Sequence, residues 1–229
     1  MKNISHSDNT EYRKANSNRN ANAEFKIGKV LIGMKKSIKS KHIACILCIA
    51  ALLSGCASSS SNGVTVTDSD HVMIGSYLTV NNTDNRLTLS DYKDALSADG
   101  LYYASWTAGD SEPYENSDGD TVDLYDAQLY LLLGEFKNNE AAQKNMDNWL
   151  EAGQNGYNVT DETTVNCGGQ SYTMITYSFS NEENPYSHGV SAFGVYNNLA
   201  VCAELTCREN YQEDLQEMLT GFLNSCTYK

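Results

Sequence analysis

The amino-acid sequence predicts an α+β domain in which helices pack on a largely antiparallel sheet. Two observations lead to this class. Short apolar segments separated by tight turns fill the second half of the chain, as in consecutive β-hairpins. Two further segments, residues 138–152 and 210–225, place apolar side chains at helical spacing and so provide helices to cover the sheet.

The first half of the domain is predicted to hold three strands, one helix and one acidic loop. In chain order these are a strand starting within 71–80, a helix at 88–100, a strand at 101–106, the loop at 108–123 and a strand at 124–136. Gly100 stands where a helix-ending glycine is expected, because glycine adopts the left-handed conformation without strain. The uninterrupted apolar run LYLLL in the last strand is typical of a central strand covered on both faces.

The second half is predicted to be a helix, a meander of four strands and a closing helix. Asn138 caps the first helix, which extends to about Ala152. Cys167-Gly168-Gly169 and Asn197-Asn198 are turn sequences between paired strands. The closing helix over 210–225 carries an apolar face made of Tyr211, Leu215, Met218, Leu219, Phe222, Leu223 and Cys226.

This layout resembles the Mog1/PsbP-like α/β/α sandwich that occurs in many small bacterial lipoproteins. Three segments carry the resemblance: the strand-then-helix step YLLLGEF…AAQKNMDNWL, the hairpin CGGQSYTMITYSF and the terminal helix YQEDLQEMLTGFLNSC. It covers most of residues 71–229. The resemblance implies a protein- or ligand-binding module more often than an enzyme.

A secretory leader precedes the domain. A positive region is followed by an apolar run of 11 residues, 43–53, which is shorter than the roughly 20 residues of a membrane-spanning helix. The run closes with Leu53-Ser54-Gly55-Cys56, which resembles the lipobox of bacterial lipoproteins. That resemblance implies cleavage between Gly55 and Cys56 and attachment of a diacylglyceryl group to Cys56. The alternative is a short buried helix with an incidental cysteine.

The leader divides the chain into four parts. We expect residues 1–33 to be a mis-called extension, since a complete signal peptide starts at Met34. The remaining parts are the lipoprotein signal peptide at 34–55, a lipidated flexible tether at 56–70 and a single α+β domain at 71–229. This organisation predicts a protein anchored by lipid to the bacterial cell membrane, on its extracytoplasmic face.

Charge excludes one class of partner. From Cys56 onward the chain has 6 basic and 26 acidic residues, a net charge of −20. Such a charge repels phosphate backbones and anionic lipid surfaces, so nucleic-acid binding is excluded and attachment to the membrane must come from the lipid.

Four cysteines remain after the leader: Cys167, Cys202, Cys207 and Cys226. A disulfide between Cys167 and Cys226 is expected if the closing helix returns to the sheet edge that carries the tight turns. Cys202 and Cys207 cannot pair within one strand, since five extended residues span about 16 Å. Four unpaired buried thiols are the alternative.

No catalytic, cofactor or metal site is predicted. Only His71 and His188 follow the leader, there is no G-x-S-x-G elbow, and His188 is expected to be a solvated loop residue. The acidic loop fails the EF-hand pattern at both ends, and loose Ca²⁺ binding by Asp118, Asp120 and Asp123 is a minor alternative to a solvated loop.

Aromatic residues near the acidic loop give one candidate site. Tyr102, Tyr103, Trp106 and Tyr114 could stack on a ligand, or they could be half-buried strand packing. The sequence therefore predicts a membrane-anchored lipoprotein with a non-catalytic protein-interaction domain, whose partner would be another envelope protein. The alternative is a carbohydrate- or small-ligand-binding lipoprotein that uses the aromatic residues within 102–125, and an enzyme ranks last.

Overall fold

The computed structural model describes residues 64–66, 71–74, 76–90, 101–115, 119–179 and 184–229. The predicted signal peptide, its cleavage site at Gly55 and Cys56, and the first part of the predicted tether lie outside the described residues.

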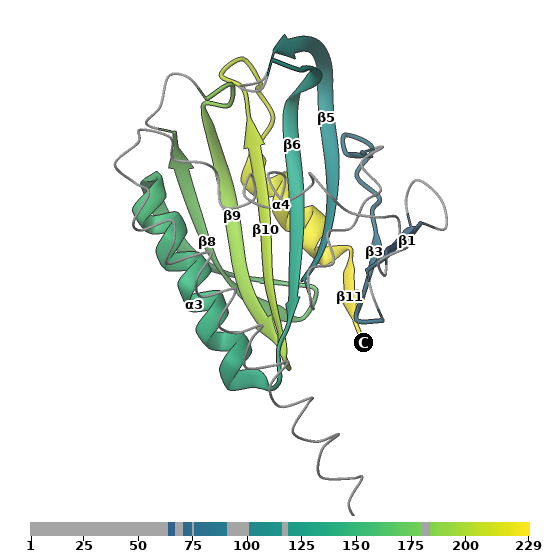
Figure 1. Cartoon of the computed structure of the whole chain (residues 1–229), viewed down its shortest axis with the longest axis vertical. Coiled ribbons are helices and arrows are strands. Elements are labelled where there is room, and N and C mark those ends of the chain that lie inside the picture. Colours follow the sequence, from purple (N-terminus) through teal and green to yellow (C-terminus); the bar gives the residue numbers. More distant parts are fainter. Residues whose placement is uncertain (1–63, 67–70, 75, 91–100, 116–118, 180–183) are drawn as a thin grey trace, which may run out of the picture. The chain divides into compact units, whose positions relative to one another are not determined.

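Seven antiparallel strands form the main sheet, in the order β4-β5-β6-β10-β9-β8-β7 (Figure 1). The strands are β4 (Thr88–Leu89), β5 (Leu101–Glu115), β6 (Thr121–Glu135), β7 (Asn158–Cys167), β8 (Gln170–Ser178), β9 (His188–Tyr196) and β10 (Leu199–Cys207). The predicted class, a largely antiparallel sheet with helices packed on it, is confirmed.

A smaller antiparallel sheet has the order β1-β2-β3-β11. Its strands are β1 (Val64–Val66), β2 (His71–Ile74), β3 (Leu78–Asn81) and β11 (Cys226–Tyr228). Two predictions are corrected here. Strand β1 lies inside the stretch predicted as a flexible tether, because it pairs with β2, and the predicted strand at 71–80 is two strands joined by a turn.

Helix α3 (Asn139–Gly156) covers one face of the main sheet. The predicted cap is confirmed: the side-chain oxygen of Asn138 accepts a hydrogen bond from the Ala141 N–H at 2.9 Å. The buried side of the helix presents Ala142, Met146 and Trp149 to the sheet, where Ile175, Phe193 and Cys202 are also buried. The helix continues one turn beyond the predicted end at Ala152.

Helix α4 (Leu215–Asn224) and the smaller sheet cover the opposite face. The predicted start at residue 210 is wrong, because the side chain of Asp214 accepts hydrogen bonds from the N–H groups of Gln216 and Glu217 and so begins the helix there. Tyr211 therefore precedes the helix. Cys226 was predicted on the helix but is the first residue of β11.

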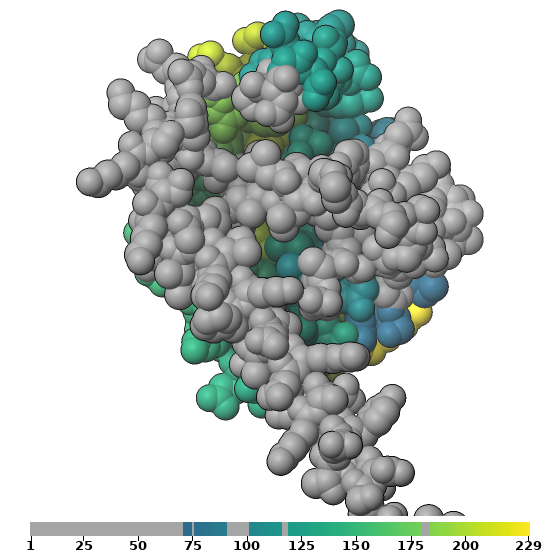
Figure 2. All heavy atoms as spheres, in the orientation of Figure 1, coloured from purple at the N-terminus to yellow at the C-terminus, as the bar shows by residue number. Residues whose placement is uncertain are grey.

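Three hairpins organise the main sheet. The predicted turns at Gly168-Gly169 and Asn197-Asn198 are confirmed, and Cys167 pairs with Gln170 while Tyr196 pairs with Leu199. The predicted acidic loop is instead a long hairpin: β5 continues to Glu115, and Tyr114 pairs with Val122. In the space-filling view the described part of this hairpin projects at the top (Figure 2). Val122 of β6 is 42% exposed.

The helix predicted at 88–100 is corrected at its start. Thr88 and Leu89 form β4, which pairs with Thr107 and Trp106 of β5. Residues 91–100 lie outside the described residues.

Candidate functional site

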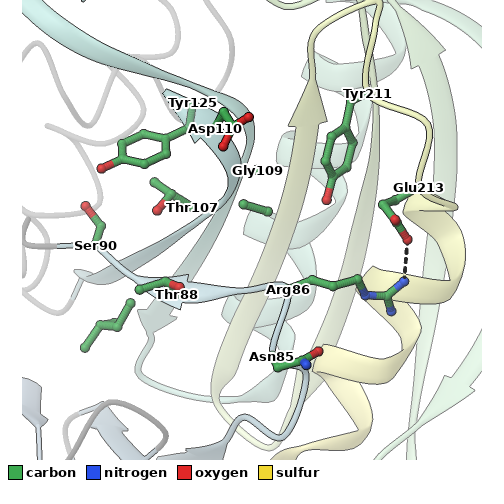
Figure 3. Close-up of a pocket in the computed structure, with 12 residues that line it drawn as sticks. Asn85, Arg86, Thr88, Ser90, Thr107, Gly109, Asp110, Tyr125, Tyr211 and Glu213 are labelled. Carbon is green, nitrogen blue, oxygen red and sulfur yellow. Dashed lines mark hydrogen bonds and ion pairs between the residues drawn. The ribbon is translucent and has the colours of Figure 1, made fainter. Parts of the chain in front are cut away.

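A hollow of about 610 Å³ lies where the β4 edge of the main sheet meets the segment that leads into α4. Figure 3 places Tyr125 and Asp110 on the sheet side and Tyr211 and Glu213 on the α4 side, with Arg86 between them. The remaining lining residues are Asn85, Thr88, Leu89, Ser90, Thr107, Ala108 and Gly109. The lining is thus rich in hydroxyl and charged groups with one tyrosine on each side.

A β-bulge shapes the sheet side of the hollow. The register between β5 and β6 shifts between Ala108 and Ser111, and Gly109 adopts a φ of +77°. A side chain on Gly109 would stand 2.6 Å from the Asp126 carboxylate. That carboxylate accepts a hydrogen bond from the Asp110 N–H at 2.8 Å, so Asp126 fixes the bulge that turns Asp110 toward the hollow.

Arg86 fixes the α4 side of the hollow. Its guanidinium forms two side-by-side hydrogen bonds with Asp84, with Nη2 2.7 Å and Nε 2.9 Å from the carboxylate oxygens. It also reaches Glu213 at 2.9 Å and Glu217 at 3.4 Å. Arg86 therefore ties the connection between β3 and β4 to the first turn of α4.

The pKa values of Asp84 and Tyr211 are shifted on this side of the hollow. Hydrogen bonds from Arg86 hold the pKa of Asp84 below its ordinary value. Burial, followed by the charge of Glu213, raises the pKa of Tyr211 to about 12. The Tyr211 hydroxyl is thus protonated at neutral pH, and it donates a hydrogen bond to the Met218 sulfur at 3.5 Å.

Replacing Arg86 with methionine is expected to lower the free energy of unfolding at neutral pH by about 1–2 kcal/mol. Since the pKa of Asp84 is depressed in the folded state, its contribution is present above the unfolded-state value of 3.8 and is lost as the pH falls through the folded-state pKa. Urea unfolding at about pH 7 and about pH 2.5 measures both effects. Lys144→Met is the control, because it removes the same charge from an exposed position of α3. If the variant loses the same free energy of unfolding at both pH values, the ion pair between Arg86 and Asp84 does not stabilise the fold.

The structure does not bring the four predicted stacking residues together. Tyr102 and Trp106 lie on the face of β5 that packs against α4 and the smaller sheet, and Trp106 is fully buried. Tyr103 points to the opposite face, where it stacks on Tyr130 at 5.5 Å. Tyr114 lies near the tip of the β5–β6 hairpin. Strand alternation separates these rings, and the aromatic residues that line the hollow are Tyr125 and Tyr211.

His188 contacts a cysteine that the sequence did not connect with it. The two residues are opposite each other on β9 and β10, and His188 Nε2 lies 3.1 Å from Cys207 Sγ. Ser187 Oγ lies 2.7 Å from His188 Nδ1. His188 is therefore half-buried rather than a solvated loop residue. Cys207 is fully buried, and burial raises the pKa of its thiol to about 12, so the pair is not an activated nucleophile.

The structure holds all four cysteines as buried thiols without disulfide bonds, and it therefore does not include the predicted Cys167–Cys226 bridge. Burial, and then the nearby Cys167, raise the pKa of Cys226 to about 12. In the exported protein the bridge stays a prediction, which a mass lower by about 2 Da in non-reduced protein would support.

A buried polar row crosses the face under α3. Ser105, Tyr130, Glu204 and Ser191 are neighbours on four adjacent strands. Glu204 is fully buried, and its carboxylate accepts hydrogen bonds from Tyr157 Oη and Ser191 Oγ, both at 3.3 Å. Hydrogen bonding of this kind offsets the free energy of burying a carboxylate, so Glu204, Tyr157 and Ser191 form a structural network.

Within the described ranges, the chain shows neither a cluster of metal ligands nor a helix that could cross a membrane. No three His, Cys, Asp or Glu side chains come together there as metal ligands. Asp118, one of the residues considered for Ca²⁺, lies outside those ranges. Neither α3 nor α4 is both long and apolar enough to cross a membrane.

Comparisons with known proteins give weak likenesses. No family model matches the chain, and no curated protein matches it. Among solved structures, the solution structure of PsbP (CyanoP) from the cyanobacterium Synechocystis sp. PCC 6803 has 11% identity and a TM-score of 0.38, covering 78% of this chain and 99% of that chain. The extracellular domain of PknH from Mycobacterium tuberculosis has 15% identity and a TM-score of 0.31, covering 55% and 63%. A PsbP structure is thus among the solved structures that this chain matches.

Proposed function

We propose that the chain is a lipid-anchored extracytoplasmic bacterial protein whose α+β domain binds a protein partner without catalysing a reaction. The observation that carries this proposal is the segment 35–56, in which a basic region, a short apolar run and Leu53-Ser54-Gly55-Cys56 follow one another. A diacyl group on Cys56 would hold the domain at the membrane, because two acyl chains give stable anchoring where one does not.

Cys207 is the cysteine that lies beside a histidine, and its burial supports a non-catalytic role. Cysteine attacks as the thiolate, whereas burial keeps the Cys207 thiol protonated beside His188. A net charge of −20 over residues 64–229 further directs binding toward cationic rather than anionic partners.

Replacing Cys56 with alanine is expected to abolish lipidation and to release the protein from the membrane fraction. The measurement is metabolic labelling of a bacterial host with an alkyne fatty acid, followed by fractionation. Cys48→Ala is the matched control, because Cys48 lies in the same leader before the cleavage site and its loss should leave labelling unchanged. Label retained in the Cys56→Ala chain would overturn the anchoring proposal.

A separate experiment tests whether the domain binds a protein partner. Chemical crosslinking of cells that carry the anchored protein, followed by purification, should give a discrete adduct of this chain with another envelope protein. Cells in which no such adduct forms, although Cys56 is lipidated, contradict a protein-interaction role.

The hollow favours a second candidate function, the binding of a neutral carbohydrate or other small polar ligand. Tyrosine rings on opposite sides and the polar groups of Asp110, Ser90 and Arg86 suit a ligand that offers both apolar ring faces and hydroxyl groups. Titration with a β-linked gluco-oligosaccharide, followed by NMR, should shift the ring signals of Tyr125 and Tyr211 if this function is correct.

A further inference from the structure

Among the described residues, strand β7 is the long unpaired edge of the main sheet. The sheet ends at β4 on one side, a strand of only 2 residues, and at β7 on the other, a strand of 10 residues. No described segment pairs with the outer edge of β7. Natural edge strands are protected by charged side chains, proline or β-bulges; β7 (NVTDETTVNC) has a bulge only near its start, and it contains no proline and no lysine.

The hairpin turn determines which backbone groups of β7 face outward. Gly168 and Gly169 have φ values of +56° and +78°, as in the two-residue type I′ turn. Such a turn closes with a hydrogen-bonded pair, here Cys167 and Gln170, and the alternation of an antiparallel ladder then continues along the strand. The N–H and C=O groups of Asn166, Thr164 and Glu162 consequently point away from β8.

The side chains at this edge leave the backbone accessible. Glu162, Thr164 and Asn166 are all exposed. A register shift between Val159 and Asp161 bends the first part of the strand, so the regular edge extends from Asp161 to Cys167. A segment of this length suffices for a partner to add as a strand.

Charge selects the partner. The regular part of β7 carries Asp161 and Glu162, and neither β7, β8 nor α4 contains a lysine or an arginine. Two copies of this chain, each with a net charge of −20 over residues 64–229, repel one another, whereas a basic segment is attracted.

We propose that β7 binds an extended, lysine- or arginine-rich segment of a partner protein, which pairs with the outer edge as an eighth strand of the main sheet. This inference rests on the proposed function, since it names the surface and the kind of partner of the interaction domain.

The direct test is titration of the full-length mature protein, kept in neutral detergent, with synthetic peptides. The probe is a peptide of about ten residues with alternating lysine and valine. One control peptide has glutamate in place of lysine, and another carries N-methyl groups on every internal residue, which keeps the charge but removes the hydrogen-bond donors of both edges. We expect the first peptide alone to bind and to slow hydrogen exchange at the amides of Glu162, Thr164 and Asn166. Equal binding of the N-methylated peptide would reduce the interaction to charge attraction and overturn the proposal.

A matched pair of variants tests the edge itself. Thr164→Pro removes an outward N–H but leaves the bonds between β7 and β8, and proline is tolerated at such edge positions. Its affinity for the lysine peptide should fall about tenfold, whereas Thr164→Ala, which keeps the N–H, should change it by less than about twofold. Thermal unfolding checks that both variants fold. Equal affinities in two folded variants overturn the proposal.

Two further outcomes separate this inference from the proposed function. If the crosslinked adduct of the anchored protein persists in Thr164→Pro, the interaction role stands and the β7 surface is wrong; loss of the adduct in this variant alone supports the surface. Exchange protection of Thr164 that rises with protein concentration in the absence of peptide would make a second copy the occupant and overturn the choice of a basic partner.

Discussion

Replacing Trp106 with alanine is expected to lower the free energy of unfolding by about 3–5 kcal/mol. Trp106 is fully buried between the main sheet and α4, and its ring meets Phe222 edge-to-face with 4.7 Å between the centroids. Removal of the indole leaves a cavity that the surrounding strands cannot close completely. Guanidinium denaturation followed by far-UV circular dichroism measures the loss without using the fluorescence of the deleted side chain.

Two other substitutions show whether Trp106 has a core role or a ligand role. Trp106→Phe should lose only about 1–2 kcal/mol, because Nε1 has no hydrogen-bond partner among the described residues and phenylalanine keeps much of the contact with Phe222. Tyr114→Ala, near the hairpin tip, should change stability by less than about 1 kcal/mol. If Trp106→Ala is no more damaging than Tyr114→Ala, Trp106 is not a core residue, and the stacking role predicted from the sequence returns.

Trp106 and Tyr114, which were predicted to belong to one site, show how far the sequence could predict the structure. Alternation along a strand separates Tyr103 from Tyr102 and Trp106, and this is readable from the spacing alone. The elements that cover the Trp106 face, α4 and β2, are distant in sequence from β5. The aromatic residues of β5 were therefore predicted as one stacking site, although alternation along the strand places them on opposite faces of the sheet.

Local signals account for the elements that were predicted correctly. The meander from β7 to β10 was predictable because two-residue turns fix the pairing of the strands on either side. The same register, counted back from Asn197-Asn198, places His188 opposite Cys207, so this contact could have been found from the sequence. The extension of β5 into the acidic segment was missed because aspartate, glycine and proline are depleted in strands.

Long-range contacts account for what was missed. In the smaller sheet, β11 pairs Cys226 with Val80, and no local pattern predicts this partner. The hollow likewise combines Arg86, Asp110 and Tyr211 from three separate parts of the chain. Its geometry depends on the β5 bulge and on the Asp214 cap, and each of these follows from the packing of neighbouring strands and helices rather than from a motif.

Gly168 is the point at which the meander meets the end of α4, and its replacement by alanine tests that contact. A Cβ atom at Gly168 would stand 2.9 Å from the carbonyl oxygen of Leu223 and 3.0 Å from that of Cys226. Both oxygens belong to the backbone and cannot rotate away. The Gly168 N–H also donates a hydrogen bond to the side chain of Asn224 at 2.8 Å, so the turn is fixed against the helix end.

Gly168→Ala is expected to lower the free energy of unfolding by about 2–4 kcal/mol, and Gly169→Ala by about 1 kcal/mol. Both glycines have positive φ values, +56° and +78°, so both variants incur the strain of a left-handed alanine. Only Gly168 faces the helix end, whereas a Cβ at Gly169 meets no atom within 4 Å. Urea unfolding of the two variants therefore isolates the contact from the backbone strain. Equal losses would mean that α4 does not end against this turn, and the placement of Cys226 beside Cys167 would then be wrong as well.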